Sequence, residues 1–402
     1  MPNSPVELKY ELFLAIFPRL ARIQGTTSVT GFRPQSAKVS PHSHRKQQML
    51  EPNMARCDAF WERRDVDRPL LTSWIGSYEV AKLYPEGLSQ LPTGQITPGD
   101  FDFEFFRADY ERLFEQHCSV DVDVPWVAMP VMVVPWLEAI AGCPIHHRDG
   151  NVWAKHWLDS YEQLDQTGLQ PDPNWLEKLA EFTQWLVRLS DGRFPVALSL
   201  MRGPADLLSA VRGAEYAIYD LYDVPGRVEG LLNLLTDLWI EAAQAQMAQI
   251  PKFADGYCFS IQQLWSRQRG GWFQDDAIAY WSPELYAQFA RPCETRLSNC
   301  MPRTGIHLHG PALFTVDHLV DMPDLDIIEV NLDDVGLKIP DMIPRSQQIL
   351  EKKRLFVWGA FTDADLHMIR EHLPARGLAL QPIAETPSQM QALSHSVRTL
   401  WG

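Results

Sequence analysis

Two histidines, His307 and His309, stand two residues apart where a short apolar stretch ends at Gly310-Pro311. Residues two apart on a β-strand point to the same side, so both imidazoles would face one surface. In α/β enzymes, chemistry is concentrated where strands end in loops. The pair therefore predicts either a divalent-metal site, with zinc as the candidate ion, or a metal-free polar pocket in which the imidazoles hydrogen-bond a ligand.

A catalytic zinc keeps three protein ligands and one open position, so the histidine pair needs a partner. Glu329, in the apolar stretch 325–332, is the predicted third ligand, with Asp276 and Glu385 as the next candidates. Zinc held there would convert a substrate thiol into a thiolate nucleophile at neutral pH. The predicted metal ligands are therefore His307, His309 and Glu329, and the predicted catalytic residues are Asp276, His307 and Glu329.

The rest of the chain supplies the elements that would position these residues. Apolar strand-like stretches lie near residues 68, 126, 194, 256, 272, 304, 325 and 355, and helical stretches separate most of them. Such alternation is typical of α/β proteins with a parallel sheet, and eight strands favour a barrel. The predicted fold class is a single (β/α)8 TIM barrel over residues 54–402, with helical additions on its N-terminal side.

Residues that follow the predicted strands are expected to converge, because the carboxyl ends of barrel strands form one face. Arg202, beside a Gly-Pro turn, would clamp a carboxylate there or lie at the surface. At most one of Asp275 and Asp276 can face the pocket, and adjacent acids also complement helix dipoles. The predicted substrate-binding residues are Trp74, Tyr78, Arg202, Gln263, Arg267, Asn331 and Trp358, and Asp333 and Asp334 follow the same strand as Glu329.

Composition excludes several classes of partner. The net charge of −15 argues against nucleic acid or an anionic membrane surface. No apolar run reaches the ~18 residues that a membrane span needs. The six cysteines are scattered, without a Cys-x-x-Cys pair, which fits a reduced cytoplasmic compartment. A small-molecule ligand in a barrel pocket is the expected partner.

Residues 1–53 differ in texture from the remainder. Residues 7–23 have helical periodicity, and residues 25–53 are rich in Ser, Thr, Gln and Pro, which favours a flexible extension. An Arg-bearing amphipathic start followed by a Ser-rich basic tract is also the pattern of an organelle transit peptide. A further alternative is an upstream start codon, with Met54 as the true beginning.

From about Ala55 to its end, the sequence resembles the uroporphyrinogen decarboxylase superfamily, which also contains corrinoid-linked methyltransferases. The resemblance implies a single (β/α)8 barrel, and it allows a homodimer. It rests on Phe60-Trp61, Asp67–Leu70, Pro135–Ile140 with Gly142–Pro144, Gly203-Pro204 with Asp220–Asp223, Asp275-Asp276, Ser282–Glu284, Pro292 and His307–Gly310.

The histidine strand resembles the methyltransferase branch most closely. That branch has His-x-Cys-Gly and a later cysteine that together hold zinc; here His307 matches the first histidine, His309 stands at the cysteine position, and no cysteine follows Cys300. The decarboxylase has an Arg-rich segment where this chain has Leu71–Gly76, which lacks arginine. The resemblance thus implies a methyltransferase-like enzyme that acts on a small molecule or on a corrinoid-linked methyl group, with zinc as the candidate metal.

Two alternatives accompany this interpretation. One is a cofactor-free carboxy-lyase of porphyrin metabolism, in which Asp276 stabilises positive charge on an electron-rich ring and Arg202 or Arg267 holds a carboxylate. The other is a barrel without catalysis that binds a tetrapyrrole or corrinoid. The first alternative needs no cofactor, whereas the methyltransferase interpretation needs a methyl donor.

Overall fold

The computed structural model describes residues 54–199, 201–332 and 338–402, and these belong to one unit. The predictions for residues 1–53, and those for Asp333 and Asp334, lie outside the described residues.

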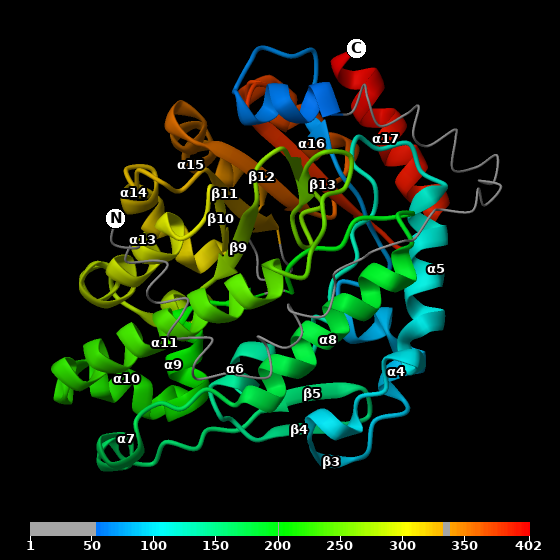
Figure 1. Ribbon diagram of the computed structural model, residues 1–402. Helices are drawn as coiled ribbons and strands as arrows, with labels where there is room; N and C mark the ends of the chain where they lie inside the picture. The colour runs from blue at the N-terminus through cyan, green and yellow to red at the C-terminus, as the bar shows by residue number, and fades with distance from the viewer. Residues whose placement is uncertain (1–53, 200, 333–337) are drawn as a thin grey trace, which may run out of the picture. The chain divides into compact units, whose positions relative to one another are not determined.

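A parallel sheet forms the centre of this unit (Figure 1). Its hydrogen-bonded order is β1-β13-β12-β11-β10-β9-β6, and β2 also pairs with β13. All of these pairings are parallel. The strands are β1 (Leu70–Leu71), β2 (Trp74–Ile75), β6 (Met201–Arg202), β9 (Gly270–Gln274), β10 (Arg303–Leu308), β11 (Ile327–Leu332), β12 (Arg354–Gly359) and β13 (Leu378–Ala384).

Two contacts close the ring between β1 and β6. The backbone N–H of Asp123 donates to the carbonyl of Leu71 at 2.8 Å, and Ala128 forms a parallel bridge with Val196. Residues 123–128 therefore take the second place in the ring, and the segment that leads into β6 takes the third. The predicted fold class, a (β/α)8 barrel, is confirmed.

Helices pack on the outside of the strands, with α17 on β13, α15 on β12 and α13 on β10. Helix α8 faces inward with its apolar side chains, among them the buried Trp175, Leu179 and Phe182. Residues 54–61 are also helical. The longer helices are α5 (Arg107–Cys118), α8 (Pro173–Ser190), α9 (Pro204–Arg212), α10 (Ala214–Asp223), α11 (Pro225–Met247), α13 (Arg291–Asn299), α15 (Ile339–Lys352), α16 (Asp363–His372) and α17 (Pro387–Trp401).

Shorter elements connect these parts. Three strands form a separate antiparallel sheet below the barrel in Figure 1: β3 (Gly94–Ile96), β4 (Ile145–Arg148) and β5 (Asn151–Ala154). The short helices are α4 (Pro85–Leu88), α6 (Trp136–Ile140), α7 (Tyr161–Thr167), α12 (Pro283–Leu285) and α14 (Val316–Leu319), with 3-10 turns η1 (Val80–Leu83), η2 (Pro98–Asp100), η3 (Phe103–Phe106), η4 (Asp276–Tyr280) and η6 (Gly310–Thr315), and a π-helical turn η5 (Tyr286–Ala290).

The strand predicted near residue 256 is wrong as a member of the barrel. β7 (Tyr257–Cys258) instead pairs antiparallel with β8 (Trp265–Ser266), and the N–H of Phe259 donates to the carbonyl of Leu264 across the turn. Gln263 in this turn has a φ of +52°, which reverses the chain rather than extending it. The eighth barrel strand is β13, which the prediction missed. The histidine strand β10 is consequently the fifth in the ring and not the sixth.

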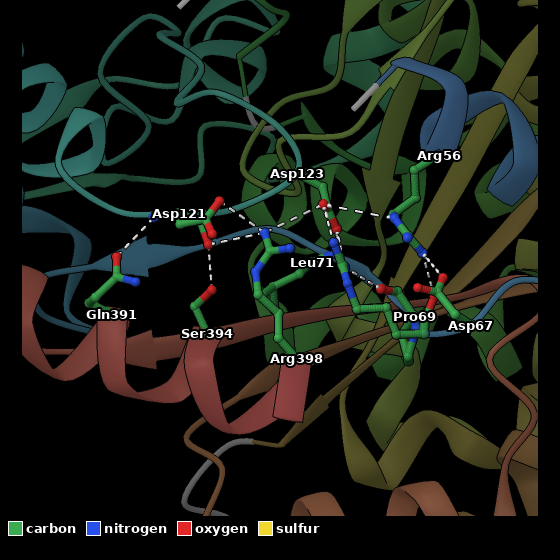
Figure 2. Close-up of polar contacts among 10 residues, drawn as sticks. Arg56, Asp67, Pro69, Leu71, Asp121, Asp123, Gln391, Ser394 and Arg398 are labelled. Carbon is green, nitrogen blue, oxygen red and sulfur yellow. Dashed lines mark hydrogen bonds and ion pairs between the residues drawn. The ribbon is translucent and has the colours of Figure 1, made fainter. Parts of the chain in front are cut away.

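A buried ion pair joins the ring where it closes. Arg68 donates to both carboxylate oxygens of Asp123, at 2.5 and 2.6 Å, and the Leu71 N–H donates to the same carboxylate at 2.9 Å. Figure 2 shows how this contact continues to α17, where Arg398 pairs with Asp121 at 3.0 Å. The first strand, the second strand and the last helix are therefore linked through these polar groups.

Among the described residues, no helix is both long enough and apolar enough to cross a membrane. The six cysteines all lie among the described residues, none of them forms a disulfide, and four of them are buried.

Candidate functional site

The carboxyl ends of four neighbouring strands carry one row of polar side chains. In the sheet register, Arg202 of β6 pairs with Gln274 of β9. Gln274 also pairs with His307 of β10, and His307 pairs with Glu329 of β11. Residues in register on adjacent parallel strands project to the same side, and their strands lie about 4.8 Å apart. The four side chains therefore share one face.

His307 is held by a carboxylate. Its Nδ1 lies 2.7 Å from Oε1 of Glu329, and both side chains are buried. Burial opposes charging of the imidazole, but the Glu329 carboxylate, together with Asp276 and Asp206, raises the pKa of His307 to about 9. Without an ion, His307 is therefore an imidazolium near neutral pH, with Nδ1–H donating to Glu329.

His309 and Asp276 lie next to the other nitrogen of His307. The Nε2 atoms of His307 and His309 are 3.1 Å apart. His309 Nε2 lies 3.7 Å from Oδ1 of Asp276, whose other oxygen accepts a hydrogen bond from Gln274 at 2.8 Å. One ligand atom from each of Asp276, His307 and His309 lies within 4.8 Å of the others.

This cluster fits a small divalent cation. A tetrahedral zinc with Zn–N distances of about 2.05 Å holds two imidazole nitrogens about 3.3 Å apart, which is close to the 3.1 Å between the two Nε2 atoms. Two histidines and one carboxylate form a donor set that zinc uses in enzymes. The Nδ1–Glu329 contact of His307 is the carboxylate–histidine arrangement that orients metal-bound imidazoles.

Glu329 is less well placed than Asp276 to be the third ligand. Its Oε1 is engaged with Nδ1 of His307, and its Oε2 accepts a hydrogen bond from Gln262 at 2.7 Å. Asp276, by contrast, has Oδ1 directed at His309 and is half-buried. Glu385 is exposed beyond the end of β13. The geometry thus favours a role for Glu329 in orienting His307.

The two adjacent acids have separate positions. Asp275 is buried, and its Oδ1 accepts from the N–H groups of Ala205 and Asp206 at the start of α9. Asp206 in turn accepts from the N–H of Ala277 at 2.8 Å. Burial and the nearby Asp276 carboxylate raise the pKa of Asp206 to about 7. The segment after β9 and the start of α9 therefore hydrogen-bond to each other through Asp275 and Asp206. Of the two adjacent acids, Asp276 is the one that faces the histidines.

Arg202 lies at the rim of the site. Its Nε is 3.5 Å from Oε1 of Glu138, a buried residue of α6, and its side chain is 51% exposed. The carboxylate of Glu138 is the main cause of the raised pKa of Arg202, and Asp206 and Asp276 add to it. Arg202 thus places a positive charge beside the carboxylates of Glu138, Asp206 and Asp276, and an anionic group can reach it.

Aromatic side chains form a wall beside His307. The ring of Trp358 lies 6.2 Å from that of His307, and Tyr78 stacks on Trp358 at 5.4 Å. Trp74 meets Trp358 edge-on at 5.3 Å. Asn331 donates to the hydroxyl of Tyr78 at 2.7 Å. Four of the predicted substrate-binding residues therefore converge on the histidines.

The structure places the other two predicted residues elsewhere. Arg267 pairs with Asp58 at 2.7 Å and lies three residues before β9 begins, so it is at the amino ends of the strands, opposite the histidines. Its assignment to substrate binding is corrected, because the strand thought to carry it is a hairpin. Gln263 is buried near Trp74, beside a cavity of about 20 Å³ that is too small for a substrate.

Three polar residues of the site were not among the predicted ones: Glu138, Asp206 and Gln274. Gln274 had a usable signal, since it precedes Asp276 by two residues and so lies on the same side of an extended chain. Gln262 also lies at the site, although the segment that carries it is a turn and not the barrel strand predicted there.

Comparison with known proteins supports the architecture. No protein-family model matches this sequence, and no curated protein matches it. Among solved structures, a methyltransferase from Methanosarcina mazei matches with a TM-score of 0.58, covering 87% of this chain and 99% of that chain at 14% sequence identity. At this identity the likeness establishes a shared α/β barrel fold.

Proposed function

We propose that this chain is a metal-dependent, methyltransferase-like enzyme of the uroporphyrinogen decarboxylase superfamily. The observation that carries the proposal is the convergence of Asp276, His307 and His309 at the carboxyl ends of the barrel strands. The fold shared with a methyltransferase supports it. These three residues would hold the metal, and Glu329 would orient His307 through Nδ1.

The metal, when bound, would lower the pKa of a bound thiol or water and so supply a nucleophile at neutral pH. The chain's own residues would arrange the reactants. Arg202 would bind an anionic group of the substrate at the rim, since about half of its side chain is exposed there. Trp358 and Tyr78 would exclude water beside His307 and pack against an apolar part of the substrate.

Metal analysis of the purified chain tests this proposal. The wild-type protein should carry about one equivalent of zinc, and His309→Ala and Asp276→Asn should carry much less, because each loses one of three ligands. His146→Ala on β4 is a matched control, since His146 stacks on Trp153 away from the site. Methyl transfer from methylcobalamin to a thiol, measured by the appearance of the demethylated corrinoid, should fall in the same two variants.

Three results would count against the proposal. Less than about a tenth of an equivalent of zinc in the wild type, with no change in His307→Ala, would remove the metal site. Release of carbon dioxide from uroporphyrinogen by the metal-free protein would favour the carboxy-lyase alternative instead. Tight binding of a tetrapyrrole without turnover would favour the non-catalytic barrel.

A further inference from the structure

The turn between β7 and β8 reaches the interior of the barrel. The side chain of Gln381, on β13, donates to the carbonyl of Ile261 at 2.7 Å. Ser260 donates to the sulfur of Met129 at 3.2 Å. Gln262 and Gln381 are fully buried, and so is Ile261 apart from a few per cent of its surface. The turn is therefore anchored from both sides among the strands.

Gln262 is the residue of this turn that reaches the histidines. Its Nε2 donates to Oε2 of Glu329 at 2.7 Å, while Oε1 of Glu329 lies 2.7 Å from Nδ1 of His307. Resting on the function proposed above, we propose that Gln262 is a positioning residue of the metal site, which acts on His307 through Glu329.

The chemistry of each atom in this chain supports the proposal. A buried carboxylate needs hydrogen-bond donors on both oxygens, and Gln262 supplies the donor that His307 cannot. With both oxygens engaged, Glu329 can rotate only by breaking a hydrogen bond. His307 Nδ1 therefore keeps its acceptor, and Nε2 keeps its direction toward His309.

The amide of Gln262 has one orientation that fits. If the amide were reversed, its oxygen would face the carboxylate oxygen of Glu329, and two acceptors would meet. In the observed orientation, Oε1 of Gln262 is buried without a hydrogen-bond partner among the described residues. Gln262 therefore makes the hydrogen bond to Glu329 while its own amide oxygen stays without a partner among the described residues. Such a local cost is expected at functional sites.

Titration of the full-length protein with Co²⁺, followed by visible absorption, tests the proposal. Gln262→Leu should bind Co²⁺ about 10–100-fold more weakly, the usual effect of removing an outer partner of a metal ligand. Ser260→Ala is the matched control in the same turn, because its hydroxyl does not touch Glu329, and it should bind as the wild type does. Equal affinity in Gln262→Leu and the wild type would overturn the proposal.

A double-mutant cycle separates positioning from a general structural effect. If Gln262 acts through Glu329, the loss in Gln262→Leu/Glu329→Gln should match the loss in Glu329→Gln alone. Additive losses would overturn the proposal and assign Gln262 to structure only. Thermal unfolding of the metal-free variants shows whether each one folds.

A second readout does not need the metal. In the metal-free wild type and in Ser260→Ala, NMR should detect a downfield Nδ1–H proton of His307, hydrogen-bonded to a carboxylate. In Gln262→Leu this signal should be weakened or lost through exchange, and an unchanged signal would overturn the proposal. If the wild type binds no Co²⁺ or zinc, the proposed function fails, while this signal still decides whether Gln262 positions His307.

Discussion

The two nitrogens of His307 have different partners, and this asymmetry defines the candidate site. Nδ1 faces the Glu329 carboxylate, and Nε2 faces His309. A cation at the site would compete with the proton on Nε2, because a metal ligand must be a neutral imidazole. Metal binding to this site is therefore expected to release a proton.

The protonation of His307 should depend on Glu329. Burial alone lowers the pKa of a histidine, and the Glu329 carboxylate is the first group that raises it. In metal-free Glu329→Gln, His307 should therefore titrate below its ordinary value near 6.5, whereas in the wild type it titrates at about 9. The measurement is an NMR pH titration of the imidazole C–H signals.

His117 is the internal reference for this titration. It is buried, its partners are backbone groups of Leu113 and Ile75, and burial lowers its pKa to about 4. Its titration should be the same in both proteins. If His307 of the variant still titrates near 9, the negative charge that raises its pKa would have to be that of Asp276 or Asp206 and not that of Glu329.

Residue spacing predicted part of this site and missed the rest for definite reasons. The pair His307 and His309 was predictable, because period-two spacing on a strand fixes the shared side. The choice between Glu329 and Asp276 as a ligand was not, since it depends on which oxygens are already engaged. The contact of Gln262 with Glu329 was not predictable, because only the tertiary fold brings a reversed turn into the barrel.

At the scale of elements, the buried carboxylates behind the site link helices to strand ends. Glu294 of α13 is fully buried and accepts a hydrogen bond from the hydroxyl of Tyr286 in η5 at 2.6 Å. Burial raises the pKa of Glu294 to about 7, against the opposing effect of this hydrogen bond. Asp275 faces the same carboxyl group, and its own pKa is raised by burial and by Glu294.

The raised pKa of Glu294 predicts a pH-dependent stability. The folded state holds the proton up to about pH 7, whereas the unfolded chain loses it near 4.5. The free energy of unfolding contributed by this group is therefore full below pH 4.5 and falls as pH rises toward 7. Glu294→Gln should remove this fall, and it should be more stable than the wild type at pH 8 by at most about 3 kcal/mol.

Urea unfolding at pH 5 and pH 8 measures this difference. Glu371→Gln is the matched control, because Glu371 is exposed on α16. The free energy of unfolding of the control should change between pH 5 and pH 8 as that of the wild type does, whereas that of Glu294→Gln should change less. A wild-type protein and a Glu294→Gln variant with the same change in unfolding free energy between the two pH values would contradict the prediction.

The sequence predicted the correct number of barrel strands, but one predicted strand is not in the barrel and one barrel strand was not predicted. The apolar stretches around β10, β11 and β12 were placed correctly, because each is a buried run bounded by turn residues. The stretch at 256–264 is equally apolar, yet it turns back at Gln263. β13 was overlooked, because Gln381-Pro382 interrupts its apolar pattern, and Gln381 is polar for its contact with the inserted turn.

At the scale of the whole molecule, the barrel depends on how its first strand is joined to the second. β1 and β2 each pair with β13 over two residues, whereas a single backbone hydrogen bond joins Leu71 to Asp123 of the second strand. Side chains must therefore contribute to closure at this point. The buried pair of Arg68 and Asp123 spans the same gap.

Removal of Arg68 should destabilise the fold more than removal of its exposed neighbours. Arg68→Met would leave the carboxylate of Asp123 buried with only the Leu71 N–H as a close donor, since Arg56 and Arg398 lie 4.0 and 3.7 Å away. Breaking one side of a buried pair costs about 3–5 kcal/mol, and these two distant arginines place the expected loss near the lower value.

Urea unfolding at pH 7 measures the loss, and Arg398→Met is the matched control. Arg398 is partly exposed and pairs with Asp121, so its loss should cost under about 1 kcal/mol. In Arg68→Met/Asp123→Leu, which removes both charges, much of the stability should return, because no unpaired charge is left inside. If Arg68→Met unfolds as Arg398→Met does, closure depends on the apolar packing of β1 and not on this ion pair.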